Sequence, residues 1–162
     1  MNPKRTIKLA CPSTGQEEWE TTRSVYDSGW LAQGPKVEEF EKNFAKRHGV
    51  QHAVATSSGT TALHLILAAM EISPSDEVIV PSFTWIATAN AVLYCGAKPV
   101  VVDVDPRTFN IGPEAVSKKI TPRTKAVMAV HQRFSKGFSI GLAQAIQRVL
   151  TRRRVVDKME GP

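Results

Sequence analysis

The sequence predicts an α/β fold built around a mainly parallel sheet. Between residues 52 and 130, short apolar segments rich in valine and isoleucine alternate with longer segments of helical periodicity. Such alternation implies crossover connections between parallel strands. Because the expected strands are apolar throughout, helices should cover both faces of the sheet, which gives an αβα sandwich. A chain of 162 residues is long enough for one such domain.

The residues before this alternation predict an arm and one amphipathic helix. The first 35 residues are polar and are interrupted by proline and glycine, so we expect an arm with a single short helix over 17–26. From residue 36, apolar side chains recur at helical spacing among charged ones, which predicts a helix to about His48. Gly49 follows directly and is placed to end that helix.

The alternation itself begins with an expected strand over 52–56 and a helix over 60–71. Pro113 suits the first position of the helix expected over 113–119, because an N–H at that position has no acceptor within the helix and proline lacks one. The remaining elements are expected as a strand over 77–80, a helix over 85–94, a strand over 99–104, a helix over 113–119 and a strand over 126–130.

The first strand-to-helix turn could bind an anion. Gly59 stands among serines and threonines at the expected start of a helix. A helix N-terminus exposes backbone amides that have no internal partner, and its dipole favours an anion. Glycine also lets the backbone approach a ligand closely, so the turn suits a phosphate group. The alternative is a plain N-cap, with Ser57 or Ser58 closing the helix and no ligand bound.

The next strand-to-helix turn carries Trp85. In an open parallel sheet, ligands collect at the carboxyl ends of the strands, so both turns should open onto the same edge. An indole at that edge could stack on a flat ring. The alternative for Trp85 taken alone is an ordinary core position. The sequence has no GxxxxGK(S/T) or GxGxxG motif, which argues against a nucleotide-binding turn.

Four motifs in succession resemble the DegT/DnrJ/EryC1/StrS family, the pyridoxal-phosphate-dependent sugar aminotransferases of fold type I. The resemblance covers about residues 7–131 and implies a partial large domain of that fold. It covers only the first third of a full-length member. The motifs occupy residues 28–37, 57–63, 80–90 and 101–105.

The resemblance implies specific roles for the two turns. The phosphate of pyridoxal 5′-phosphate would sit on the amides around Gly59 and Thr60, with Thr61 adjacent, and Trp85 would stack on the pyridine ring. A member of the family would move an amino group from glutamate to the keto group of a nucleotide-linked sugar, for surface polysaccharides or antibiotic sugars. It would do so as a homodimer. Some relatives instead dehydrate sugars with the same cofactor, and the sequence leaves that alternative open.

The resemblance ends before the family's catalytic residues. The lysine that binds the cofactor covalently (the Schiff-base lysine) and the acid that pairs with the pyridine nitrogen would follow the segment equivalent to 126–131. Residues 132–162 do not resemble the family, so no residue is assigned a catalytic role. We therefore expect a truncated or frameshifted chain that is inactive alone. The expected domains are an arm over 1–35, a partial cofactor-binding domain over 36–131 and an unrelated basic tail over 132–162.

Charge and cysteine content leave one further class of function open. The net charge of +6 belongs mostly to the tail, which has seven basic and two acidic side chains. A tail that binds nucleic acid or another polyanion is the alternative function, although no aromatic residues alternate with its arginines as in many nucleic-acid-binding segments. Two distant cysteines match no metal or redox spacing, and no apolar run could span a membrane. These features predict a cytoplasmic protein without a metal site.

Overall fold

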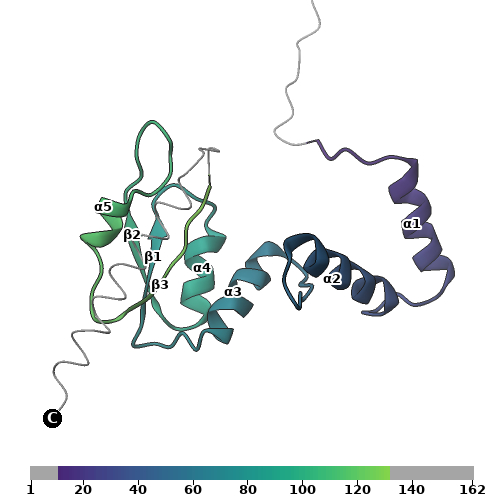
Figure 1. Ribbon diagram of the computed structural model, residues 1–162, viewed down its shortest axis with the longest axis horizontal. Coiled ribbons are helices and arrows are strands. Elements are labelled where there is room, and N and C mark those ends of the chain that lie inside the picture. The colour runs from purple at the N-terminus through teal and green to yellow at the C-terminus, as the bar shows by residue number, and fades with distance from the viewer. Residues whose placement is uncertain (1–10, 132–162) are drawn as a thin grey trace, which may run out of the picture. The chain divides into compact units, whose positions relative to one another are not determined.

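The computed structural model of the protein describes residues 11–131 (Figure 1). Within this range the chain divides between Ala55 and Thr56 into two compact units, each of which is described by itself. The beginning of the expected arm and the whole of the expected basic tail, residues 132–162, lie outside the described residues. The domain limits expected at residues 35 and 131 stay predictions.

The first unit consists of two helices, α1 (Gln16–Asp27) and α2 (Pro35–His48). In α1, the Glu18 carboxylate accepts a 2.6 Å hydrogen bond from the N–H of Gly15, the residue before the helix. Helix α2 has Pro35 in its first turn and ends at Gly49, whose φ of 65° is the left-handed conformation that glycine adopts without strain. Both expected helices are therefore confirmed, as is the role of Gly49.

The second unit is built on a parallel sheet of three strands, in the order β2-β1-β3. Both neighbouring pairs are parallel, which confirms the predicted sheet type. Its chain order is α3 (Gly59–Ala69), β1 (Glu77–Pro81), α4 (Ala87–Tyr94), β2 (Lys98–Val102), α5 (Pro113–Ser117) and β3 (Thr124–Val127).

The central strand β1 is buried on both faces. Val78 and Val80 belong to a core cluster with residues of α3 and α4, such as Leu67 and Val92. Ile79 points to the opposite face. There it meets a second cluster of buried residues, Val102, Ile111 and Val116, the last of which lies on α5. Figure 1 shows α4 and α5 on opposite sides of the strands, so this unit is an αβα sandwich as the sequence predicts.

Two expected elements differ from the structure. Residues 52–56 form no strand within the described range, because no neighbouring strand offers them a ladder of hydrogen bonds. Instead, the Ala55 N–H donates to the Glu41 carboxylate at 2.7 Å. Trp85, expected at the start of a helix, lies in the loop before α4, which begins at Ala87. The other expected elements are present with shifted ends.

Within residues 11–131, none of the helices combines the length and the apolar character needed to cross a membrane.

Candidate functional site

The first turn of α3 is shaped by a reciprocal cap between Ser58 and Thr61. Ser58 is the N-cap residue, and its Oγ accepts a hydrogen bond from the Thr61 N–H at 3.2 Å. In return, Thr61 Oγ1 accepts from the Ser58 N–H at 3.0 Å and donates to the Ser58 carbonyl at 2.8 Å. The capping expected from Ser57 or Ser58 is therefore confirmed for Ser58. The amide and hydroxyl of Thr61 are both engaged within the cap.

This cap leaves two backbone donors at the helix end. Within residues 11–131, the N–H groups of Gly59 and Thr60 have no hydrogen-bond acceptor. A Cβ built on Gly59 would meet no atom within 4 Å, so the space beside this residue is open. The first turn of α3 also has no acidic side chain to repel an anion. Helix dipole, free amides and open space together suit a phosphate group.

Trp85 is the most exposed large hydrophobic residue in the described part of the chain, at 79% of its possible surface. It lies in the loop that joins the carboxyl end of β1 to α4. The expectation that it is not an ordinary core residue agrees with this exposure. An indole this exposed can stack on a flat ring.

The same unit holds both parts of the candidate site. Helices α3 and α4 pack against each other through a shared core, to which Leu67 of α3 and Ala91 of α4 belong. The ring of His64 on α3 also meets the ring of Tyr94 on α4 edge-on, with centroids 5.6 Å apart. The loop after β1 and the N-terminus of α3 are thus anchored on neighbouring elements of one compact core.

Sequence reasoning missed the residues that hold the Trp85 loop. Ser82 donates through its N–H to the Val102 carbonyl at 2.8 Å and through its Oγ to the Asp103 carboxylate at 3.2 Å. The available signal was the position of Ser82 and Asp103 directly after two neighbouring parallel strands. By themselves, Asp103 and Asp105 indicate only a turn that leads into Pro106.

That interpretation is correct for Asp105. Its carboxylate accepts hydrogen bonds from the N–H groups of Arg107 at 2.8 Å and Thr108 at 3.1 Å, and it pairs with the Arg107 guanidinium at 3.4 Å. The Arg107 backbone hydrogen bond is the main cause that lowers the pKa of Asp105 below its ordinary value. Asp105 is thus a turn-forming carboxylate held in its charged form.

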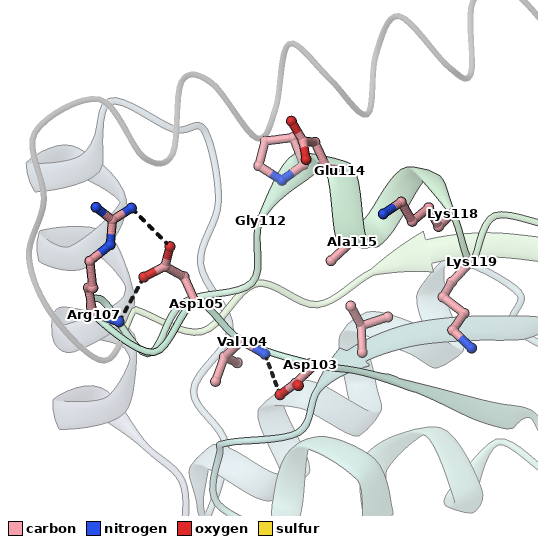
Figure 2. A pocket seen from close by; sticks show the side chains of 11 residues that line it. Asp103, Val104, Asp105, Arg107, Gly112, Glu114, Ala115, Lys118 and Lys119 are labelled. Atoms are coloured by element: carbon pink, nitrogen blue, oxygen red, sulfur yellow. Dashed lines mark hydrogen bonds and ion pairs between the residues drawn. The ribbon is translucent and has the colours of Figure 1, made fainter.

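An open hollow of about 790 Å³ lies beside this turn, between the end of β2 and α5 (Figure 2). Both carboxylates and cationic side chains line it, and its walls include none of the four residues expected to hold the cofactor. The mixed charge selects no particular ligand. Its lining includes Asp103, Asp105, Arg107, Glu114, Lys118 and Lys119.

Comparison with known proteins matches most of the chain to one family. The model of the DegT/DnrJ/EryC1/StrS aminotransferase family matches residues 12–135. GDP-perosamine synthase of Caulobacter vibrioides is 53% identical over 126 residues, which are 77% of this chain and 34% of that protein. The chain therefore spans about a third of the length of this curated relative.

Solved structures give the same result. The aminotransferase TlmJ from Streptoalloteichus hindustanus is 37% identical with a TM-score of 0.80, over 92% of this chain and 40% of that one. Spr1654 from Streptococcus pneumoniae, in its PLP form, is 33% identical with a TM-score of 0.72. That match covers 76% of this chain and 31% of the Spr1654 chain.

Proposed function

The chain belongs to the DegT/DnrJ/EryC1/StrS aminotransferase family, and on that premise we propose that it forms the cofactor-holding part of a sugar aminotransferase. By resemblance the cofactor is pyridoxal 5′-phosphate. The amino donor proposed is glutamate, and the acceptor is the keto group of a nucleotide-linked sugar. The observation that carries the proposal is the pair of unpaired amides, Gly59 and Thr60, beside open space at the start of α3.

The residues present fit such a cofactor in three respects. The amides of Gly59 and Thr60 would bind the phosphate, and the missing Cβ of Gly59 would let the phosphate oxygens approach the backbone. Thr61 would act mainly by holding Ser58 in the cap, since its own donors are engaged. Trp85 would cover the pyridine ring and exclude water from one of its faces.

When bound, the cofactor supplies an electron sink that stabilises negative charge on the reacting carbon. The described residues would orient this group and donate backbone hydrogen bonds to its phosphate. We assign no residue of 11–131 to the covalent lysine or to the acid that pairs with the ring nitrogen. The homodimer and the cytoplasmic location are further parts of the proposal, and the free thiols of Cys11 and Cys95 are compatible with a reducing compartment.

The alternative of a polyanion-binding tail concerns residues outside the described range and stays a prediction. Dehydration of a sugar with the same cofactor also stays open. No contact among the described residues favours either alternative over the aminotransferase.

The proposal is tested by titrating the protein with pyridoxal phosphate and, separately, with pyridoxal, and following the quenching of tryptophan fluorescence. We expect pyridoxal phosphate to bind more tightly, because only it engages the helix end. Gly59→Ala should remove most of that advantage, since its methyl group would occupy the phosphate space.

Gly112→Ala is the matched control. A Cβ there also meets no atom within 4 Å, but Gly112 precedes α5 and lies away from α3. It should bind like the unaltered protein. Equal affinity for pyridoxal and pyridoxal phosphate, or equal losses in the two glycine variants, would contradict the proposal.

A further inference from the structure

The loop over residues 82–86 is attached to the end of the neighbouring strand β2. Besides the backbone bond to Val102, Ser82 Oγ donates to Asp103 Oδ1 at 3.2 Å. The same carboxylate oxygen accepts the Val104 N–H at 2.9 Å, as the dashed line in Figure 2 shows. The Val104 contact fixes the carboxylate against its own backbone. Asp103 can therefore hold Ser82 in a defined position.

A second contact joins the same two loops. The rings of Phe83 and Phe109 lie 5.3 Å apart between centroids, tilted by 39°. Phe109 has a φ of 57°, a left-handed conformation that is unfavourable for a residue with a side chain. Two backbone bonds hold it there, from the Phe109 N–H to the Asp105 carbonyl at 2.7 Å and from the Asp105 N–H to the Asn110 carbonyl at 3.0 Å.

We call the Ser82–Asp103 and Phe83–Phe109 contacts the loop brace. A strained backbone conformation persists only where its surroundings enforce it, and such sites cluster near functional loops. Here the enforced conformation places an aromatic ring against the loop that carries Trp85. The hydrogen bond and the ring contact act on adjacent residues, so together they restrict the loop more than either does alone.

Trp85 itself depends on this loop for its orientation. Within the described residues, its indole has no ring partner and no hydrogen bond, and most of its surface is exposed. Packing around the side chain therefore does not fix it. Its position follows from the backbone of residues 82–86.

From these contacts we infer that Asp103 and Phe109 are positioning residues, which hold Trp85 in place through the loop brace before the cofactor binds. The inference rests on the proposed role of Trp85 as the cover of the cofactor ring. A loop that is already ordered loses less conformational freedom on binding, so the brace increases affinity without touching the ligand.

The motion of Trp85 can be measured without any cofactor. The chain has three tryptophans, so the double substitution Trp19→Phe/Trp30→Phe leaves Trp85 as the only indole. Time-resolved fluorescence anisotropy then reports its local motion on the nanosecond scale. We expect Asp103→Ala and Phe109→Ala each to increase the amplitude of the fast decay.

Conservative and milder variants distinguish loss of the loop brace from a general loss of folded structure. In Asp103→Asn the amide oxygen can still accept the hydrogen bonds from Ser82 and Val104, so the slow decay should be retained. Ser82→Ala removes a single exposed hydroxyl and should reproduce the faster motion in a folded protein. Glu114→Ala is the control. The Glu114 carboxylate lines the same hollow as Asp103 but makes no contact with the loop, so its removal should leave the decay unchanged.

Cofactor affinity gives the second readout. Loss of the Asp103 acceptor should weaken pyridoxal phosphate binding by about fivefold, the equivalent of one ordinary hydrogen bond. Asp103→Asn should bind like the background protein. These titrations use the single-tryptophan background, in which quenching reports on Trp85 alone.

The two readouts distinguish the inference from the proposed function. If Asp103→Ala, Ser82→Ala and Phe109→Ala, each folded by circular dichroism, show the decay of the background protein, the inference is wrong whether or not cofactor binds. Faster motion with unchanged affinity also overturns it. If the background protein binds no pyridoxal phosphate, the proposed function fails, and the anisotropy still decides whether the brace holds Trp85.

Discussion

The carboxylate of Glu77 accepts a 2.6 Å hydrogen bond from the hydroxyl of Thr121, 44 residues further along the chain. This contact ties the first residue of β1 to the segment that leads into β3. Arg123 adds a hydrogen-bonded ion pair at 2.8 Å, and Lys98 of β2 adds another at 3.4 Å. One carboxylate, only 4% exposed, thus joins the starts of all three strands.

We predict that this carboxylate makes the fold sensitive to acid. The Thr121 hydrogen bond is the main cause that lowers the pKa of Glu77 below its ordinary value of 4.5, and the Arg123 and Lys98 contacts act in the same direction against desolvation. A carboxyl whose pKa is lowered by folding stabilises the fold above its unfolded pKa. That contribution is lost as the pH falls from about 4.5 through the lower folded value.

The measurement is urea unfolding at about pH 7 and about pH 3 for the unaltered chain and for Glu77→Gln. The variant should be less stable at neutral pH and should lose less stability on acidification. Glu114→Gln, an exposed carboxylate on α5, serves as the control and should follow the unaltered chain. Parallel pH dependences for Glu77→Gln and the unaltered chain would show that Glu77 is not the sensitive group.

A second prediction concerns the cap of α3. Ser58→Ala removes the oxygen that accepts the Thr61 N–H, and N-cap losses of this kind destabilise a protein by about 1 kcal/mol. Urea unfolding should show this loss. Ser57→Ala removes only a 3.3 Å contact between hydroxyls and should cost much less. Equal losses in the two variants would mean that Ser58 is not the effective cap.

A third prediction concerns the approach of Trp30 to Gly34 in the first unit. The Trp30 indole donates to the Gln33 carbonyl at 3.0 Å, and a Cβ on Gly34 would overlap the indole nitrogen. Gly34→Ala must therefore displace the indole and break this hydrogen bond. In a protein without the other two tryptophans, the emission of Trp30 should shift to longer wavelength.

Two controls accompany this change. Gly15→Ala, where a Cβ would make an ordinary 3.5 Å contact, should leave the emission unchanged. The second control compares Trp30→Ala with the double variant Trp30→Ala/Gly34→Ala by circular dichroism. The two spectra should be nearly the same, because the ring that would clash with the methyl group added at residue 34 is absent from both. A Gly34→Ala protein with native Trp30 emission would refute the predicted clash.

A fourth prediction concerns the end of α2. Gly49 has a φ of 65°, so Gly49→Ala forces a side chain into the left-handed region and should destabilise the fold by about 1–2 kcal/mol. Gly49→Asn should lose less, because asparagine tolerates this conformation better. Thermal unfolding followed by circular dichroism gives both values. The prediction fails if alanine is tolerated as well as asparagine.

Local sequence signals were sufficient to predict the helices and the strands of the three-stranded sheet. The apolar run at β1, the periodicity of α2 and the glycine after it are properties of neighbouring residues, and the structure confirms each. A cap from Ser57 or Ser58 could also be expected, because a serine side chain at a helix start accepts a hydrogen bond from a free backbone N–H, and the structure has it at Ser58. The candidate cofactor turn could be located from the same local pattern.

Interactions between distant residues could not be predicted in this way. Residues 52–56 have the composition of a strand, but strand formation depends on a partner, and Ala55 instead bonds to Glu41. The Ser82–Asp103 and Phe83–Phe109 contacts join loops whose proximity follows only from the pairing of β1 with β2. A glutamate at the start of an apolar strand gave no indication of Thr121 as its partner.

The burial of β1 on both faces has a consequence for strand alignment. In a sheet with one solvent-exposed face, a shift in strand register by one residue is prevented because it would expose the apolar side chains. Here Val78, Ile79 and Val80 are all buried, so a slipped strand would exchange one aliphatic residue for another with little penalty. Glu77 distinguishes the observed alignment from a shifted one, since any other alignment would separate a buried charge from its three partners. The alignment of this sheet is thus specified by a polar residue at its margin, and errors of alignment during folding should rise when that residue is made neutral.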